Sequence, residues 1–295
     1  MVMPSFLTED RSSLKIGSCC FGVPIALHHT YFFLLLVVLI ASARYTDAAF
    51  GLFMFLLYGP VLLITIVIHE LGHILMTRRL GGEVGQIVLW PLGGFAICGP
   101  TNCGAWGDFR VAIAGPLTHI PQMVFWVGMY AAFSRGDFSD FSMSYYLVEL
   151  SVSASDFFRI LSQQAFWTNL FIFAFNLFVP AYPLDGGRAL VSLLFLRGMR
   201  MEKIASIASW FSMVIGGGLL IFGLYSFIWL HSPNGIFMAI VSAYILQSSV
   251  LLYSMKRDGR LKEHPMFGRA CYEEQEELGS SSSMGVPKAE EAEMA

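Results

Sequence analysis

Long apolar stretches alternate with short polar segments along most of this chain. Six of these stretches approach the roughly 20 residues that a helix needs to cross a bilayer. The pattern therefore predicts an all-α polytopic membrane protein with about six transmembrane helices. The predicted spans are 25–43, 50–78, 109–133, 166–180, 204–230 and 236–253.

The segment at 83–98, which follows the second predicted span, has a different pattern. Its first part, 84–89, is rich in residues that favour strands, and Pro91, Gly93 and Gly94 then disfavour a helix. We expect a small membrane-inserted β-hairpin here, with the 84–89 edge free to bind an extended peptide. Non-helical backbone at membrane depth is tolerated only against protein or water, so the hairpin should line a cavity.

Composition agrees with a multi-span membrane protein. Of the 295 residues, 56% are hydrophobic and only 13% are charged, against about 25% charged for an average soluble domain. The mean hydropathy is +0.63. The net charge of −3 says little about partners, and no basic cluster suggests nucleic-acid binding. The five cysteines lack C-x-x-C spacing, so neither a disulfide framework nor a thiolate zinc site is indicated.

Lys and Arg indicate the orientation of the spans. They follow the second span at Arg78 and Arg79, the fourth span within 188–203, and the sixth span within 256–262. The positive-inside rule then predicts an integral multi-pass protein with both termini on the cytosolic side.

Polarity also divides the chain into three parts. We expect a cytosolic N-terminal segment at 1–20 and a transmembrane core at 21–255. The remaining segment, 256–295, is acidic and poor in apolar residues, which predicts a mostly disordered tail.

The sequence His69-Glu70-Leu71-Gly72-His73 lies inside the apolar stretch of the second span. On a helix, histidines four residues apart project from one face and can reach one metal ion. Glu70 would lie close by as a general base that takes a proton from water. Ionisable groups are costly within a membrane, so this cluster predicts a zinc hydrolase that works there. If the helix starts afresh at Pro60, His73 lies about 9 Å from its cytosolic end.

A zinc hydrolase needs a third protein ligand, and Asp185 is the best candidate. It follows the cytosolic end of the fourth span, on the side that the histidines approach. Pro180 and Pro183 should stop the helix and leave an extended corner, while the glycine pair 186–187 permits a close approach of backbone. A helix cap or a simple turn residue is the alternative interpretation of Asp185.

These motifs together resemble the site-2 protease family of intramembrane zinc metalloproteases, peptidase family M50. The resemblance rests on the HELGH sequence and on Pro183-Leu184-Asp185-Gly186-Gly187, and it extends to 21–28, 91–94 and Ala114-Gly115-Pro116-Leu117. It covers most of 20–255. It implies one zinc ion per chain held by His69, His73 and Asp185, with Glu70 activating water. It further implies that the substrates are transmembrane segments of other membrane proteins.

Two positions depart from the family pattern. His119 stands where the family commonly has Asn, so it is either a hydrogen-bonded packing histidine or a residue with a role near the site. The spacing between Asn176 and Asp185 is one residue longer than usual, with Val179 the apparent insertion. The resemblance assigns Asn176 to substrate positioning, and an interhelical hydrogen bond is its alternative role.

Two other functions are compatible with parts of this pattern. Prenyl-protein peptidases also carry HExxH, but they take a third ligand from a later glutamate, and 204–253 contains none. A catalytically inactive membrane-protein binder is the second alternative. The presence of all four key residues argues against it, and His119 keeps it open.

Overall fold

The structure is a computed structural model of the 295-residue chain. It describes residues 13–18, 21–32, 36, 40, 48–90, 93–99, 101, 104–142, 153–230, 234–264 and 266–267. Its elements are β1 (Ser13–Ser18), β2 (Pro24–His28), α3 (Ala48–Leu56), a π-helix (Leu57–Val61), α4 (Leu62–Arg79), β3 (Val84–Trp90), β4 (Gly93–Cys98), α5 (Gly104–Leu117), α6 (His119–Ser134), α7 (Ala154–Phe178), α8 (Asp185–Leu196), α9 (Met201–Ile228), α10 (Asn234–Arg257) and a 3₁₀ turn (Leu261–Glu263).

Three helical segments in the described part of the chain are long and apolar enough to cross a membrane. They are 49–79, 201–228 and 235–257, and they coincide with the second, fifth and sixth predicted spans. The first predicted span, 25–43, lies mostly outside the described residues. The total of six spans therefore stays a prediction.

The predicted third span, 109–133, is divided into α5 and α6 at Thr118. Pro116 and Pro121 flank this point, and neither has the amide hydrogen that a continuous helix needs. The Thr118 backbone N–H and its hydroxyl both donate to the carbonyl of Gly115, at 3.0 and 2.7 Å. The sequence predicted that these two prolines kink the third span, and the structure interrupts the helix between them.

The sequence suggested that the helix with the HELGH sequence starts afresh at Pro60. The structure shows that it does not. A π-helical turn accommodates Pro60 and joins α3 directly to α4. The wider turn tolerates the missing amide hydrogen of proline. The hydroxyl of Tyr31 donates to the carbonyls of Tyr58 and Gly59, at 3.2 and 3.3 Å, and so satisfies backbone acceptors of this turn.

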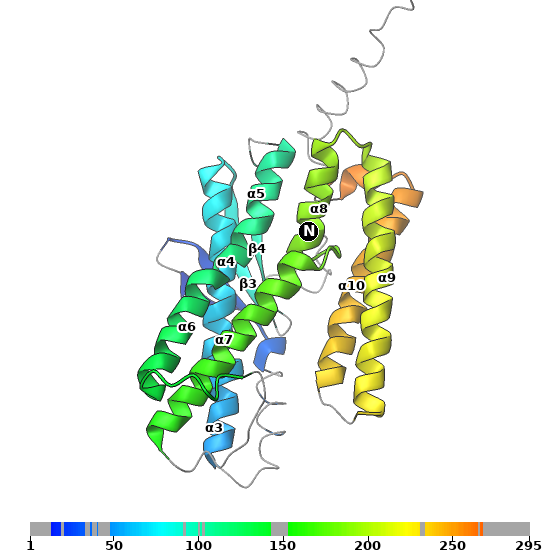
Figure 1. Cartoon of the computed structure of the whole chain (residues 1–295). Coiled ribbons are helices and arrows are strands. Elements are labelled where there is room, and N and C mark those ends of the chain that lie inside the picture. The colour runs from blue at the N-terminus through cyan, green and yellow to red at the C-terminus, as the bar shows by residue number, and fades with distance from the viewer. Residues whose placement is uncertain are drawn as a thin grey trace, which may run out of the picture.

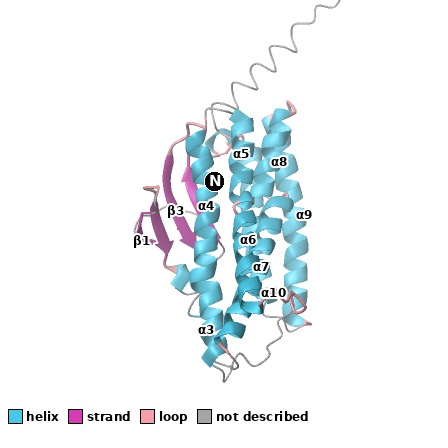
Figure 2. Cartoon of the chain, turned by 60° about the vertical axis from the view of Figure 1, so that its left-hand side comes forward, coloured by secondary structure: helices cyan, strands magenta, loops and turns pink. Residues whose placement is uncertain are grey.

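A four-stranded sheet in the order β1-β2-β3-β4 lies against α4 (Figure 2). The predicted hairpin is confirmed, because β3 and β4 pair antiparallel from Val84 opposite Cys98 to Trp90 opposite Gly93. Strand β2 pairs parallel with β3, and β1 pairs antiparallel with β2. Strand β3 is therefore internal, and the expectation of a free edge at 84–89 was wrong. The outer strand on this side is β4.

Residues 25–28 form most of β2 and not the start of a helix, which corrects the predicted first span. Ile25, Ala26 and Leu27 pair with 87–89 of β3. A strand that is buried on both faces reads as a continuous apolar run, and this pattern does not distinguish it from a buried helix. The fold is thus mainly helical with a larger sheet than the all-α prediction allowed.

The helices form two groups in the view of Figure 1, with α3 to α7 on one side and the α9–α10 pair on the other. Helix α8 packs against both α5 and α9 and so joins the groups. The described chain remains packed as far as Phe267, because Leu261, Met266 and Phe267 are buried against Val191 and Ile204. The rest of the predicted tail, 268–295, lies outside the described residues.

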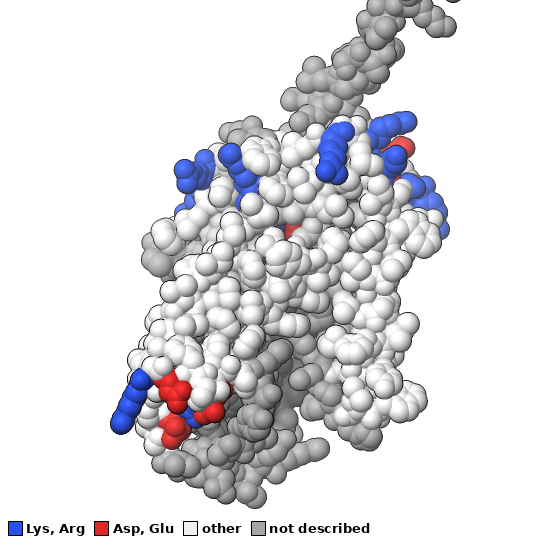
Figure 3. All heavy atoms as spheres, viewed as in Figure 1, with Lys and Arg blue, Asp and Glu red and all other residues white. Residues whose placement is uncertain are grey.

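Charged side chains gather at the two ends of the molecule and leave the middle of the visible face apolar (Figure 3). Lys and Arg predominate at the end where α4 finishes with Arg78 and Arg79, and α10 finishes with Lys256 and Arg257. The acidic side chains visible on this face lie mainly at the opposite end. An apolar belt between two charged ends is the distribution expected of an integral membrane protein.

Candidate metal centre

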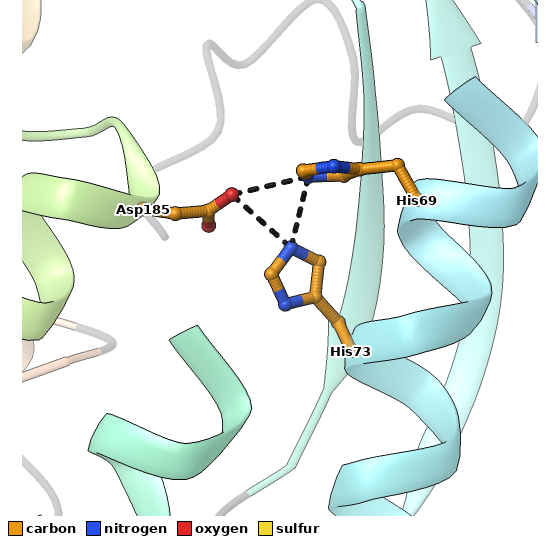
Figure 4. A group of neighbouring side chains, drawn as sticks. All are labelled: His69, His73 and Asp185. Carbon is orange, nitrogen blue, oxygen red and sulfur yellow. Dashed lines mark hydrogen bonds and ion pairs between the residues drawn. The ribbon is translucent and has the colours of Figure 1, made fainter. Parts of the chain in front are cut away.

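Three predicted ligands converge from two helices (Figure 4). The Nε2 atoms of His69 and His73 lie 3.2 Å apart. The Oδ2 atom of Asp185 lies 3.1 Å from the first nitrogen and 3.3 Å from the second. All three side chains are buried. The structure therefore brings together residues that are 116 positions apart in the sequence.

The sequence had suggested that Asp185 lies on an extended corner. In the structure it is instead the first residue of α8. Leu184, in extended conformation, precedes it as the cap residue and has no side-chain cap bond. The first turn of a helix is a favourable place for a carboxylate, because the helix dipole is positive there. The helix start also fixes the backbone from which this carboxylate reaches the histidines.

The glycine pair after Asp185 is required by close backbone contacts. A Cβ at Gly186 would lie 2.6 Å from the carbonyl oxygens of Leu177 and Val179, and one at Gly187 would lie 2.4 Å from the backbone of Ala181. These distances exclude a side chain at both positions. The start of α8 is thereby held tightly against the end of α7 and the loop that follows it.

Hydrogen bonds behind the ligands direct their free lone pairs toward one point. The Nδ1–H of His73 donates to the carbonyl of Val111 at 2.7 Å, which leaves Nε2 as the nitrogen with a lone pair. Arg188 Nη1 lies 3.4 Å from Asp185 Oδ1, and Oδ2 faces the imidazoles. The Nδ1 atom of His69 lies 3.0 Å from Nε2 of His119.

Gly115 of α5 keeps the space beside the histidine nitrogens open. A Cβ at this position would lie 2.2 Å from Nε2 of His73 and 2.8 Å from Nε2 of His69. A methyl group at residue 115 would thus overlap the imidazole of His73 and crowd that of His69. The absence of a side chain at this position lets α5 pack directly against the two histidines.

The donor set fits one zinc ion. Two imidazole nitrogens and one carboxylate oxygen face one another within 4.8 Å, and a cation satisfies all three acceptors at once. Two histidines and a carboxylate are a known set of ligands for catalytic zinc, and three protein ligands leave a coordination position open. The predicted ligands His69, His73 and Asp185 are therefore suitably placed.

Glu70 and Asn176 line one cavity of about 230 Å³ beside the three ligands. Glu70 is buried on α4, and Gly94 of β4 packs so closely that a Cβ there would lie 3.0 Å from Cγ of Glu70. Asn176 is half-buried on α7, and its carbonyl oxygen adjoins Gly186. Both residues therefore share a cavity with the three ligands.

Comparison with known proteins agrees with this geometry. The model of peptidase family M50 matches residues 58–219, which include all three ligands. The chain belongs to peptidase family M50. A zinc metalloprotease of Methanocaldococcus jannaschii is 31% identical over 205 residues, which are 70% of this chain and 52% of that protein. A putative zinc metalloprotease of Synechocystis is 27% identical over 266 residues, 86% of this chain and 62% of that protein.

A solved structure extends the similarity to the fold. The site-2 protease from Methanocaldococcus jannaschii superimposes with a TM-score of 0.54 at 25% identity, over 81% of this chain and 94% of that one. The chain spans 52% and 62% of the length of the two M50 relatives above. The family and the fold are thus established for the part of the chain that carries the site.

Sequence reasoning did not identify the contacts that Gly115 and Asn169 make near the ligands. Gly115 packs against both imidazoles, and Asn169 joins His119 in a hydrogen-bonded chain behind His69. Arg188, which the sequence placed near headgroups or a carboxylate of the site, contacts Asp185. His119 and Asn169 give a signal, because His and Asn are rare inside apolar spans. Their partners come from other helices, however, so sequence spacing does not reveal the contacts.

Proposed function

We propose that this protein is a zinc metalloendopeptidase that cleaves transmembrane segments of other membrane proteins. The observation that carries the proposal is the convergence of His69, His73 and Asp185 next to Glu70 in an apolar cavity. Membership of family M50 and helices long enough to cross a membrane support the same activity and location. The transmembrane core is proposed to be 21–255, with both termini on the cytosolic side.

In this proposal the roles of the residues follow from their chemistry. Zinc, when bound by His69, His73 and Asp185, supplies Lewis-acid polarisation of a carbonyl oxygen. Glu70 takes a proton from the attacking water and later gives it to the leaving amine. Arg188 holds the second oxygen of Asp185 in place. Asn176, across the cavity on α7, orients the substrate backbone.

The cavity walls suit an apolar polypeptide. Side chains from α4, α7, α9 and α10 line it, including Ile66, Phe171, Phe175, Leu219 and Val241. Gly93, Gly94, Ala96 and Cys98 of β4 line the same cavity. Because β4 is the outer strand of the described sheet, an extended substrate segment can add to it through main-chain hydrogen bonds. Helical substrates must therefore unwind before cleavage.

The experiment compares the purified wild-type protein with Glu70→Gln and Asp185→Ala in liposomes that contain a transmembrane model substrate. Wild type should bind about one zinc ion per chain and cleave the substrate. Glu70→Gln should keep the zinc and lose cleavage, because the glutamine amide does not accept the proton. Asp185→Ala should lose both.

Unchanged cleavage by Glu70→Gln would contradict the proposed general base. A wild-type protein that binds zinc but leaves every transmembrane substrate intact would favour the inactive binder instead. The structure gives no specific support for that alternative.

A further inference from the structure

His119 lies at the centre of a buried chain of polar side chains behind the proposed zinc centre. It is the first residue of α6 and is fully buried. Its Nε2 lies 3.0 Å from Nδ1 of His69, and its Nδ1 lies 2.9 Å from Oδ1 of Asn169. The residue therefore joins α4 to α7 through hydrogen bonds at both ring nitrogens.

The direction of these bonds can be deduced from the far end of the chain. One amide atom of Asn169 lies 2.9 Å from the carbonyl oxygen of Ala165, which accepts hydrogen bonds and never donates them. That atom must be the NH₂ nitrogen, and its second hydrogen points to the hydroxyl of Thr65 at 3.4 Å. The amide atom that faces His119 is therefore the oxygen.

An amide oxygen only accepts, so Nδ1 of His119 must carry the proton and donate it to Asn169. In a neutral imidazole the other nitrogen then has a lone pair. Nε2 of His119 consequently accepts from Nδ1–H of His69. This leaves the lone pair of His69 on Nε2, the atom that faces Asp185 and His73.

The two histidine ligands thus reach the same tautomer by different means. His73 donates its Nδ1–H directly to the backbone carbonyl of Val111. His69 is 3.0 Å from an imidazole, which by itself is able to donate or accept. Among the described residues, the amide of Asn169 determines whether this imidazole donates a hydrogen bond to His69 or accepts one from it. The proton order at His69 therefore depends on a residue with which it has no direct hydrogen bond.

We propose that His119 is a positioning residue of the zinc centre: polarised by Asn169, it fixes the tautomer and ring orientation of His69. This inference rests on the proposed function, because it assumes that His69 binds zinc. It differs from the packing interpretation of His119, in which the hydrogen bonds of this residue hold helices together without ordering the proton of His69. Outer hydrogen-bond partners of histidine ligands typically contribute about 10–100-fold to metal affinity or activity.

The first test compares His119→Gln with His119→Leu by measuring zinc dissociation constants against a competing chelator in detergent. The glutamine amide offers an oxygen to His69 and an N–H to Asn169, so the order of the bonds is preserved. Leucine fills the space and offers neither. We expect His119→Leu to bind zinc about 10–100-fold more weakly and His119→Gln to stay within about threefold of wild type.

The second test acts on the relay without touching His69. Asn169→Leu removes the acceptor that orients His119. His119 can then carry its proton on Nε2 and donate to Nδ1 of His69, which places the proton of His69 on Nε2, the atom that faces the metal. We expect weaker zinc binding, by about tenfold. Ser162→Ala, also on α7 and also buried, removes a hydroxyl that, among the described residues, donates to the carbonyl of Phe158. This control should bind zinc like wild type.

The third test is spectroscopic and requires no activity. In zinc-loaded protein labelled with ¹⁵N-histidine, the His119 ring should show a protonated Nδ1 and an unprotonated Nε2. The signals are assigned by their disappearance in His119→Gln. An Nε2–H tautomer of His119 would overturn the proposal even if every variant folds poorly.

The outcomes separate this inference from the proposed function. If wild type binds no zinc, or if Asp185→Ala binds zinc equally well, the metal centre itself is wrong. If zinc binding depends on Asp185 but His119→Leu binds as tightly as wild type, only the role of His119 is wrong. Equal losses in the Leu and Gln variants would reduce His119 to a packing residue and also overturn the inference.

Discussion

Single residues around the metal centre act mainly in two ways: they allow close packing, or they form hydrogen bonds that orient the ligands. His69 and His73 were recognisable from their spacing on an apolar helix, and Asp185 was recognisable from the topology of the predicted spans. His119 was recognisable as a candidate near the site, but that His69 and Asn169 are its partners was not, because each lies 50 positions away on another helix. The periodicity of one helix carries no information about such a contact.

Gly115 gives the most direct test of the space for the ion. In Gly115→Ala the new methyl group would lie 2.2 Å from Nε2 of His73, so we expect zinc content to fall from about one ion per chain to almost none. Metal analysis of the purified protein measures this directly. Gly128→Ala in the adjoining helix α6 is the matched control, because a Cβ there meets no atom within 4 Å. Full zinc content in both variants would contradict the assigned position of the ion.

At the scale of elements, the sequence predicted helices and the hairpin more reliably than their connections. The spans at 49–79, 201–228 and 235–257 are long apolar runs, and a run of this length has few alternatives to a helix. Strand β2 was missed because its apolar residues continue those of the predicted first span. The two prolines of the third span predicted a kink, and the structure places the interruption between them, at Thr118.

Close packing of α9 against α10 requires glycine at some positions of α9 and not at others. A Cβ at Gly223 of α9 would lie 2.9 Å from backbone atoms of Ala239 and Gly235 in α10, whereas one at Gly217 would meet no atom within 4 Å. We expect Gly223→Ala to separate the helices and to cost about 1–3 kcal/mol of stability. Gly217→Ala, in the same helix, should cause no loss. Apparent melting temperatures in one detergent compare the two, and equal values would contradict close packing at Gly223.

Strand β4 predicts a preference among substrates. Addition to its outer edge requires an extended segment, and each glycine in place of a good helix former weakens a helix by about 1 kcal/mol. A model substrate with two glycines near the cleaved bond should therefore be cleaved up to about 30-fold faster than one with leucine alone, because two glycines weaken the helix by about 2 kcal/mol. Initial rates at equal substrate density in liposomes measure the ratio. Equal rates for the two substrates would argue against binding as a strand.

At the scale of the whole molecule, the segment after α10 closes the packing around the loop that leads to Asp185. Nδ1 of His264 accepts from the backbone N–H groups of Met266 and Phe267. Its Nε2–H is then the donor to the hydroxyl of Tyr182, at 3.2 Å. Tyr182 precedes Asp185 by three residues, so the end of the described chain is tied to the metal-binding side of α8.

This arrangement predicts that two truncations differ in their effect on stability and zinc affinity. A chain that ends after residue 259 loses Leu261, Met266 and Phe267, three side chains buried in one apolar cluster with Tyr182. Burial of such side chains contributes about 1.5–3 kcal/mol each, so the apparent melting temperature should fall by roughly 10 °C. Zinc affinity should fall as well, because the loop before Asp185 loses its support. A chain that ends after residue 268 keeps these contacts and should match the full-length protein in both measurements. If the shorter chain also matches it, the segment after α10 does not support the metal centre, and the contacts of α8 with α5, α7 and α9 are sufficient to hold it.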